Sequence, residues 1–356
     1  MSNWQRLTTV SQLTAHLRAE LARGTWHGRM PGVIRLAGEL GVARNSVEAA
    51  LRELELEGLL VSQGHGRGRL IDLKDGGDDR VSGARVALLV SEASDRRLDY
   101  LIELRHELAE AGHRVSYASV SMVELGMDVK RIARMVEKTD ADAWVVTAGS
   151  HEILEWFAAR EVPAFALFGR RRGLPMAGVG PNKPPAFAAA TRALISQGHR
   201  RIVLLARPRR RWPEPGASEQ AFLNELAAHG IAPGSYHLPD WEESIEGFHA
   251  RLDSLFQFTP PTALIIEEAP LFAATQQFLA SRRLRVPQEV SLVCTDADPT
   301  FDWCQPSVAH IRWDSRPVVR RIVRWAANVS QSKEDVRQTL TPAEFVPGGT
   351  IGPAKG

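Results

Sequence analysis

The chain has 356 residues, of which 44 are Lys or Arg and 42 are Asp or Glu, so its formal net charge is only +2. That length predicts two or three domains, and the near-neutral balance excludes diffuse binding of nucleic acid, so any DNA contact must come from a local basic patch. No run is apolar enough for a membrane helix or a signal peptide, and two cysteines are too few for a disulfide framework or a zinc site. We therefore expect a cytoplasmic protein with no membrane partner, metal or cofactor.

The first part of the chain has the pattern of a winged helix. An amphipathic helix is expected from Thr8 to Arg23, followed by two short segments of helical periodicity on either side of Gly41. Glycine can take the positive φ that a tight turn between two helices requires, so these segments predict a helix-turn-helix. Strand-like runs at 59–61 and 69–71 flank a glycine-rich turn and predict a hairpin directly after it.

Polar side chains at the start of the second helix of this motif are candidate DNA contacts. Arg44, Asn45 and Ser46 open that helix, whose first residues enter the major groove in helix-turn-helix proteins. Arg and Asn can each grip a purine through two hydrogen bonds, and Ser suits a phosphate. The other residues expected to contact DNA are Arg35 on the preceding helix and, on the hairpin turn, Gly64, His65, Gly66 and Arg67.

These motifs resemble the DNA-binding domain of the GntR family of bacterial transcription regulators. The matching elements are Leu36-Ala37, Gly41 to Val47, Ala50-Leu51, Glu57-Gly58 and the glycines of the hairpin turn. The chain departs from the pattern at Ile34 and at Glu48, where the family often has basic residues. These departures affect the expected operator sequence and leave the domain assignment intact; the alternative is a winged helix that binds no DNA.

The rest of the chain alternates between strands and helices. Residues 74–83 have almost no apolar content and predict a linker. Repeated strand–helix units then predict doubly wound parallel sheets in two lobes, an α/β fold. The expected strands are at 85–90, 115–118, 143–147, 163–168, 201–205, 262–266 and 289–294. The expected domains are 1–73 for DNA binding, 74–83 for the linker, 84–349 for the two lobes (84–177 plus 308–328, and 178–298) and 350–356 for a tail.

A second resemblance covers residues 84–349, which are similar to the effector domain of the LacI family and so to periplasmic binding proteins. It rests on Leu194 to Ile202, Pro261 to Leu264, Leu284 to Val293, Asp296 and Pro306 to Ile311. Regulators that join the two domains form a subgroup to which arabinose repressors belong. The resemblance implies a homodimer whose lobes close on a small effector.

Several positions that grip sugar hydroxyls in that family are changed in this chain. We expect Asp296 and Asn182 to face each other across the cleft, because ligands bind at the carboxyl ends of parallel strands. Arg170 and Arg207 lie near the same rim and favour an acidic sugar derivative, since Arg binds carboxylates through paired hydrogen bonds. Trp303 is expected either to stack on the ligand or to pack between the lobes.

Together these patterns predict a dimeric transcription regulator, a repressor, that binds double-stranded operator DNA and a small polar effector. The alternatives are a regulator whose cleft no longer binds a ligand and a two-lobed sensor with no DNA role. An enzyme is the least favoured, because the sequence has no glycine-rich phosphate loop, metal-ligand cluster or nucleophile elbow.

Overall fold

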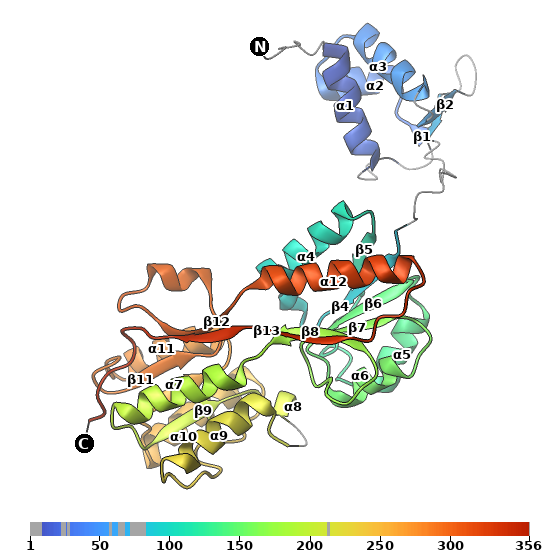
Figure 1. The fold of residues 1–356 in the computed structure, drawn as a ribbon. Coiled ribbons are helices and arrows are strands. Elements are labelled where there is room, and N and C mark those ends of the chain that lie inside the picture. Colours follow the sequence, from blue (N-terminus) through green and yellow to red (C-terminus); the bar gives the residue numbers. More distant parts are fainter. Residues whose placement is uncertain are drawn as a thin grey trace, which may run out of the picture. The chain divides into compact units, whose positions relative to one another are not determined.

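The computed structural model describes residues 9–22, 26, 29–56, 59–62, 68–71, 83–211 and 214–355. The chain forms two compact units, one within residues 1–80 and the other within 81–356 (Figure 1). Among the described residues, no helix has the length and apolar character needed to cross a bilayer.

The first unit is a three-helix domain with a small antiparallel sheet. Its helices are α1 (Thr9–Ala22), α2 (Val33–Leu40) and α3 (Arg44–Leu56), and its strands β1 (Arg29–Met30), β2 (Leu60–Ser62) and β3 (Arg69–Ile71) pair in the order β1-β3-β2. Leu17, Leu36 and Leu51 are fully buried between the helices, and each such side chain stabilises the fold by about 1.5–3 kcal/mol. Gly41 ends α2 with a φ of +64°, and its N–H donates to the carbonyl of Ala37. The structure therefore confirms the helix-turn-helix with strands directly after it.

The first lobe of the second unit is built on a six-stranded parallel sheet in the order β13-β8-β7-β6-β4-β5. The strands are β4 (Arg85–Leu89), β5 (Arg114–Tyr117), β6 (Ala143–Thr147), β7 (Ala164–Leu167), β8 (Ala177–Pro181) and β13 (Gln338–Thr341). Helices α4 (Asp99–Glu110) and α12 (Ser315–Ser330) cover one face, and α5 (Val129–Glu137) and α6 (His151–Ala158) cover the other (Figure 1). A short 3-10 helix, η1 (Ala93–Arg97), follows β4.

The second lobe has a five-stranded sheet in the order β14-β12-β11-β10-β9, in which only β14 is antiparallel. The strands are β9 (Ile202–Leu205), β10 (Ala263–Ile266), β11 (Ser291–Cys294), β12 (Ala309–Trp313) and β14 (Ala343–Val346). One face packs against α7 (Pro184–Ser196) and α9 (Ala217–Ala228), and the other against α10 (Ile245–Phe258) and α11 (Ala269–Ser281). The short helices α8 (Pro208–Arg211) and η2 (Pro299–Trp303) follow β9 and β11.

Polar side chains fix the start of several helices. A side-chain oxygen at the N-cap accepts a backbone N–H of the first turn, which satisfies one of the donors that a helix leaves unpaired. The capping residues are Asp128 for α5, Ser150 for α6, Ser244 for α10 and Asp314 for α12. The helices and strands predicted for the two lobes are present close to their expected ends.

The lobe boundaries differ from those predicted. Residues 178–181 are part of β8, which pairs with β7 in the first lobe, and β12 pairs with β11 in the second lobe although 308–328 was assigned to the first. Strands β8, β12, β13 and β14 were not predicted, because their sequences have no continuous apolar run. The expected tail is also wrong at its start: Thr350 is 1% exposed, and its hydroxyl donates to the carbonyl of Leu292 at 2.7 Å.

Candidate DNA-binding face and effector cleft

The start of α3 presents polar side chains over a buried apolar face. Arg44 and Asn45 are exposed and Ser46 is half-buried, whereas Val47, the next residue, is fully buried against α1 and α2. The helix is thus held by its apolar side while its first turn remains available to a ligand. Arg35 on α2 is also exposed, and its guanidinium is paired with Glu39 one turn later at 2.7 Å. The structure therefore brings the four described candidates onto two adjoining helices.

Glu48, where the GntR pattern often has a basic residue, is neutralised by a residue that the sequence did not single out. The guanidinium of Arg69 on β3 lies 2.8 Å from the carboxylate of Glu48 and 2.6 Å from that of Glu55. Glu48 and Glu55 are both on α3, so Arg69 joins the hairpin strand to the helix that carries the candidate base contacts. The remaining candidates, Gly64 to Arg67, lie outside the described residues.

In the second unit, the carboxyl ends of strands from both lobes carry charged residues that meet. Glu92 follows β4 in the first lobe, and Arg207 follows β9 in the second; their side chains form an ion pair at 2.9 Å. A second contact between the lobes joins the guanidinium of Arg170, after β7, to the carbonyl of Glu214 at 2.8 Å. This is the edge where open α/β sheets bind ligands, so the predicted cleft is the place where the two lobes touch.

Arg207 is surrounded by carboxylates. Besides Glu92, its guanidinium is 3.0 Å from Glu268 and 3.7 Å from Glu243, and its backbone N–H donates to Glu267. The side chain of Arg207 is 19% exposed, so these groups meet in a partly desolvated place where charge interactions are strong. Three carboxylates therefore lie within 4 Å of this guanidinium, and a fourth binds the backbone of the same residue. The structure therefore weighs against the expectation that Arg207 binds an acidic effector.

Backbone strain is concentrated at the same edge. Ala148 after β6, Phe168 after β7 and Glu268 after β10 have φ values of 51°, 64° and 67°. Residues with a side chain are costly in this region, by about 1–3 kcal/mol each, and such strain is commonly found at functional sites. The conformation of Glu268 places its carboxylate on Arg207.

Asp296 is engaged by a lysine that the sequence did not reveal as a site residue. The ammonium of Lys183 lies 2.5 Å from the carboxylate of Asp296 and donates to the carbonyl of Thr295 at 3.2 Å. Asn182, the residue before it, has an exposed side chain, and its backbone N–H donates to Thr341. Asn182 therefore adjoins the residue whose side chain binds Asp296, and whether the two predicted residues face each other stays a prediction. The position of Lys183 directly after Asn182 is the signal that could have indicated it.

An aromatic cluster lies beside this edge, where β12 leads into α12. Tyr100 of α4, Phe168 and Trp313 of β12 pack edge to face, with ring centroids 5.5–5.6 Å apart. It joins the first lobe to the last residue of a second-lobe strand. Trp303 behaves differently: its side chain is 89% exposed on η2, so it does not pack between the lobes, one of its two predicted roles.

Other residues of the LacI-like motifs have a structural role. The ring of His199 is 1% exposed and contacts the hydroxyls of Thr262 at 2.9 Å and Ser291 at 3.0 Å, and the carbonyl of Gly352 at 2.9 Å. Burial lowers the pKa of His199, although the bond to Gly352 opposes this shift. Three separated motifs therefore meet in one buried network that holds the second lobe together.

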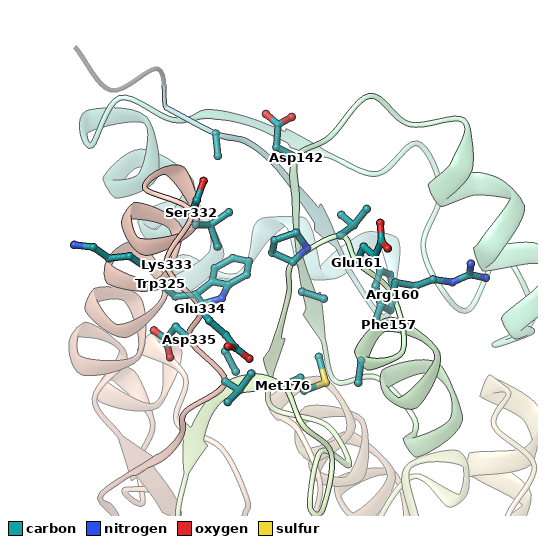
Figure 2. Close-up of a pocket in the computed structure, with 18 of the residues that line it drawn as sticks. Asp142, Phe157, Arg160, Glu161, Met176, Trp325, Ser332, Lys333, Glu334 and Asp335 are labelled. Atoms are coloured by element: carbon teal, nitrogen blue, oxygen red, sulfur yellow. The ribbon is translucent and has the colours of Figure 1, made fainter. Parts of the chain in front are cut away.

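A cavity of about 710 Å³ lies at the opposite end of the first-lobe sheet. Figure 2 shows Trp325 and Met176 among the residues that line it, with charged side chains such as Asp142 and Lys333. Its walls come from the amino ends of β4, β7 and β8, away from the edge where such sheets bind ligands. We therefore place the candidate effector site at the lobe junction. In the described part of the chain, no group of His, Cys, Asp and Glu side chains could hold a metal ion.

Part of each unit matches a known kind of domain. Residues 9–70 match the model of the gntR family of bacterial regulatory proteins, and residues 191–351 match that of a periplasmic binding protein-like domain. A search of curated protein sequences finds no match.

Several solved structures share the fold. The Lac repressor dimer bound to operator and the anti-inducer ONPF is 18% identical, with a TM-score of 0.61 over 75% of this chain and 93% of that one. A complex of the transcriptional regulator CelR with cellobiose is 18% identical, with a TM-score of 0.61 over 90% and 100% of the two chains. A LacI family regulator from Enterococcus faecium with bound ribose is 16% identical, with a TM-score of 0.61 over 76% and 100%.

Proposed function

We propose that this chain, in which a gntR-type DNA-binding domain precedes a LacI-type, periplasmic binding protein-like domain, is a transcription regulator that represses its target genes until a small polar effector binds at the lobe junction. The observation that carries this function is the exposed start of α3, where Arg44 and Asn45 project from a helix held by buried Val47. Such a surface reads base edges in the major groove, and the second unit supplies the control.

A neutral sugar fits the lobe junction better than a sugar acid. The two arginines that were expected to bind a carboxylate are engaged within the protein, Arg207 by glutamates and Arg170 by the carbonyl of Glu214. Hydroxyl groups, which both donate and accept hydrogen bonds, could use the carboxylates of Glu267 and Asp296 and the ammonium of Lys183. The similar structures with bound cellobiose and ribose support this class of ligand.

The protein is expected to act as a homodimer through its second unit. The two half-sites of an operator lie about 34–36 Å apart on the DNA, so a pair of winged helices must be held at a fixed spacing. The similar Lac repressor structure is a dimer bound to operator. An effector that alters the spacing by a few ångströms would lower operator affinity.

A thermal-shift screen of neutral sugars and sugar acids on the full-length protein tests the proposed effector class. A true effector at about a hundred times its dissociation constant should add about 2.7 kcal/mol to the free energy of unfolding. The same sugar should release the protein from an operator selected in its absence. Stabilisation by sugar acids alone, or stabilisation with no change in operator affinity, would contradict this proposal.

A further inference from the structure

The contacts between the lobes suggest how the cleft behaves without an effector. We propose that the Glu92–Arg207 ion pair is a latch that holds the two lobes together while the cleft is empty, so that an effector must compete with it. This inference rests on the proposed function, because it concerns regulation of the same site. At the ligand-binding edge, charged groups are paired across the junction between the lobes.

Arg207 is anchored much more firmly to its own lobe than to the other one. Glu268 at 3.0 Å, Glu243 at 3.7 Å and the bond from its backbone N–H to Glu267 all come from the second lobe. The pair with Glu92, at 2.9 Å, comes from the first. Opening the cleft therefore breaks one ion pair and leaves the guanidinium with carboxylate partners, so the charge of Arg207 is never left uncompensated. Such a contact can be made and broken repeatedly.

Glu92 is held in place on the first lobe in the same way. It lies directly before η1, and its backbone N–H donates to the carboxylate of Asp95 at 2.9 Å. Its side chain is 30% exposed, and that of Arg207 is 19% exposed. The guanidinium of Arg207 and the backbone of Glu92 are thus placed before the pair forms, which reduces the conformational freedom that is lost when it does. A prepositioned pair in a partly desolvated junction gains more than a pair of free surface side chains.

The aromatic cluster gives the lobes a second attachment. Tyr100, Phe168 and Trp313 pack where β12 of the second lobe leads into α12 of the first. This contact is apolar and lies on a segment of chain that passes between the lobes, so it can stay packed while the lobes rotate. The cleft therefore has a pivot at one place and a polar latch at another, where the ligand-binding strand ends meet.

The latch is tested by measuring the distance between the lobes in the full-length protein without DNA or effector. One spin label is placed on the exposed residue 137 of α5 and one on the exposed residue 235 of the second lobe, in a Cys304→Ser background. Cys294 is fully buried and can be left in place. Dilution with an excess of unlabelled protein removes distances between the subunits of a dimer.

The wild-type protein should give one narrow peak in the distribution of distances between the two spin labels. Glu92→Gln should broaden this peak or move it to longer distance. Glu243→Gln is the matched control, because it removes a second-lobe carboxylate from Arg207 and leaves Glu92, the partner from the first lobe, in place. Glu92→Gln together with Arg170→Met should broaden the peak further. A Glu92→Gln distribution equal to that of the wild type, or an equal effect of Glu243→Gln, would overturn the latch.

A second measurement covers the case in which the variants do not fold. For the wild-type protein, raising the salt concentration should broaden the same peak gradually, because screening weakens a partly exposed ion pair; an unchanged peak up to about 1 M salt would also count against the latch. Neither measurement uses DNA or a sugar. Failure of the latch is therefore distinguishable from failure of the proposed function, which would appear as a lack of operator or sugar binding.

Discussion

Replacing Arg69 with Met should weaken operator binding even though Arg69 is not on the helix that carries the candidate base contacts. Its guanidinium, with a side chain only 16% exposed, is paired with Glu48 at 2.8 Å and with Glu55 at 2.6 Å. Met retains the apolar stem and removes the charge, so Glu55 loses its pair with Arg69 and Glu48 keeps only the more distant Arg52, at 3.8 Å. Glu48 is one turn after Arg44 and therefore lies on the same side of the helix. With its closer partner removed, this carboxylate should repel the phosphates of bound DNA.

The size of the effect follows from the exposure of the three side chains. The side chains of Glu48 and Glu55 are 38% and 23% exposed. Each ion pair therefore contributes more to stability than a surface pair and less than a buried one. Arg69→Met should lower the free energy of unfolding by about 1–2 kcal/mol. Operator binding should weaken about tenfold, which corresponds to about 1.4 kcal/mol. Fluorescence anisotropy with a selected operator at fixed salt measures the second quantity, and thermal unfolding measures the first.

Two double variants distinguish an effect of charge on DNA affinity from an effect on folding. Glu48→Gln combined with Arg69→Met should recover most of the lost DNA affinity, because the carboxylate that should repel the phosphates is gone. Glu55→Gln combined with Arg69→Met should recover much less, since Glu55 is two turns further along α3 than Glu48. Wild-type operator affinity for Arg69→Met alone, or equal recovery by the two double variants, would refute the reasoning.

Further predictions concern other parts of the chain. Arg44→Ala should reduce specific operator binding by about 1–3 kcal/mol and relax sequence preference at one base pair in a selection experiment; unchanged preference would contradict its role. The fragment 84–356 should be dimeric by light scattering at micromolar concentration, and a monomer would contradict the proposed assembly. A thiol reagent should modify half-exposed Cys304 quickly and Cys294 only on unfolding, because burial raises the pKa of the Cys294 thiol. Hydrogen bonds from Arg85 lower the pKa of Asp142 to about 2, so Asp142→Asn should cost about 1 kcal/mol of unfolding free energy at pH 7, after allowance for the exposure of this carboxylate. That cost should disappear as the pH falls from about 4 towards 2, and a cost that persists at pH 2 would show that the charge is not its cause.

Local patterns predicted most strands whose sequences are strongly apolar, and failed where the reason for a strand lies elsewhere in the chain. Strand β8 contains Gly178 and Gly180 and has little apolar content of its own. The side chain of Arg171 lies across these two glycines, and a Cβ at Gly178 would be 2.5 Å from its Cδ. The strand exists because β7 and the distant β13 pair with it on either side. Such a cause cannot be read from a short window of sequence.

For the candidate sites, too, the sequence predicted positions along the chain but not the contacts that these residues make. The start of α3 could be located, because helical periodicity and Gly41 mark the turn before Arg44. Strand ends at Arg207 and Asp296 were also found, since each follows a continuous apolar run. The partners of these charged residues could not be predicted. Whether Glu92 reaches Arg207 depends on how closely the two lobes approach each other, and that distance cannot be derived from local sequence patterns.

The central claim is that this protein reads specific DNA through the start of α3. It is tested most directly by selecting binding sequences from a random duplex library with the full-length protein and with Arg44→Ala. The wild type should enrich a site with two related half-sites about one helical turn apart, and its affinity for this site should fall steeply with salt. The Arg44→Ala protein should enrich a degenerate version of the same site. Recovery of no preferred sequence by the wild type, or of the same sequence by both proteins, would contradict the claim.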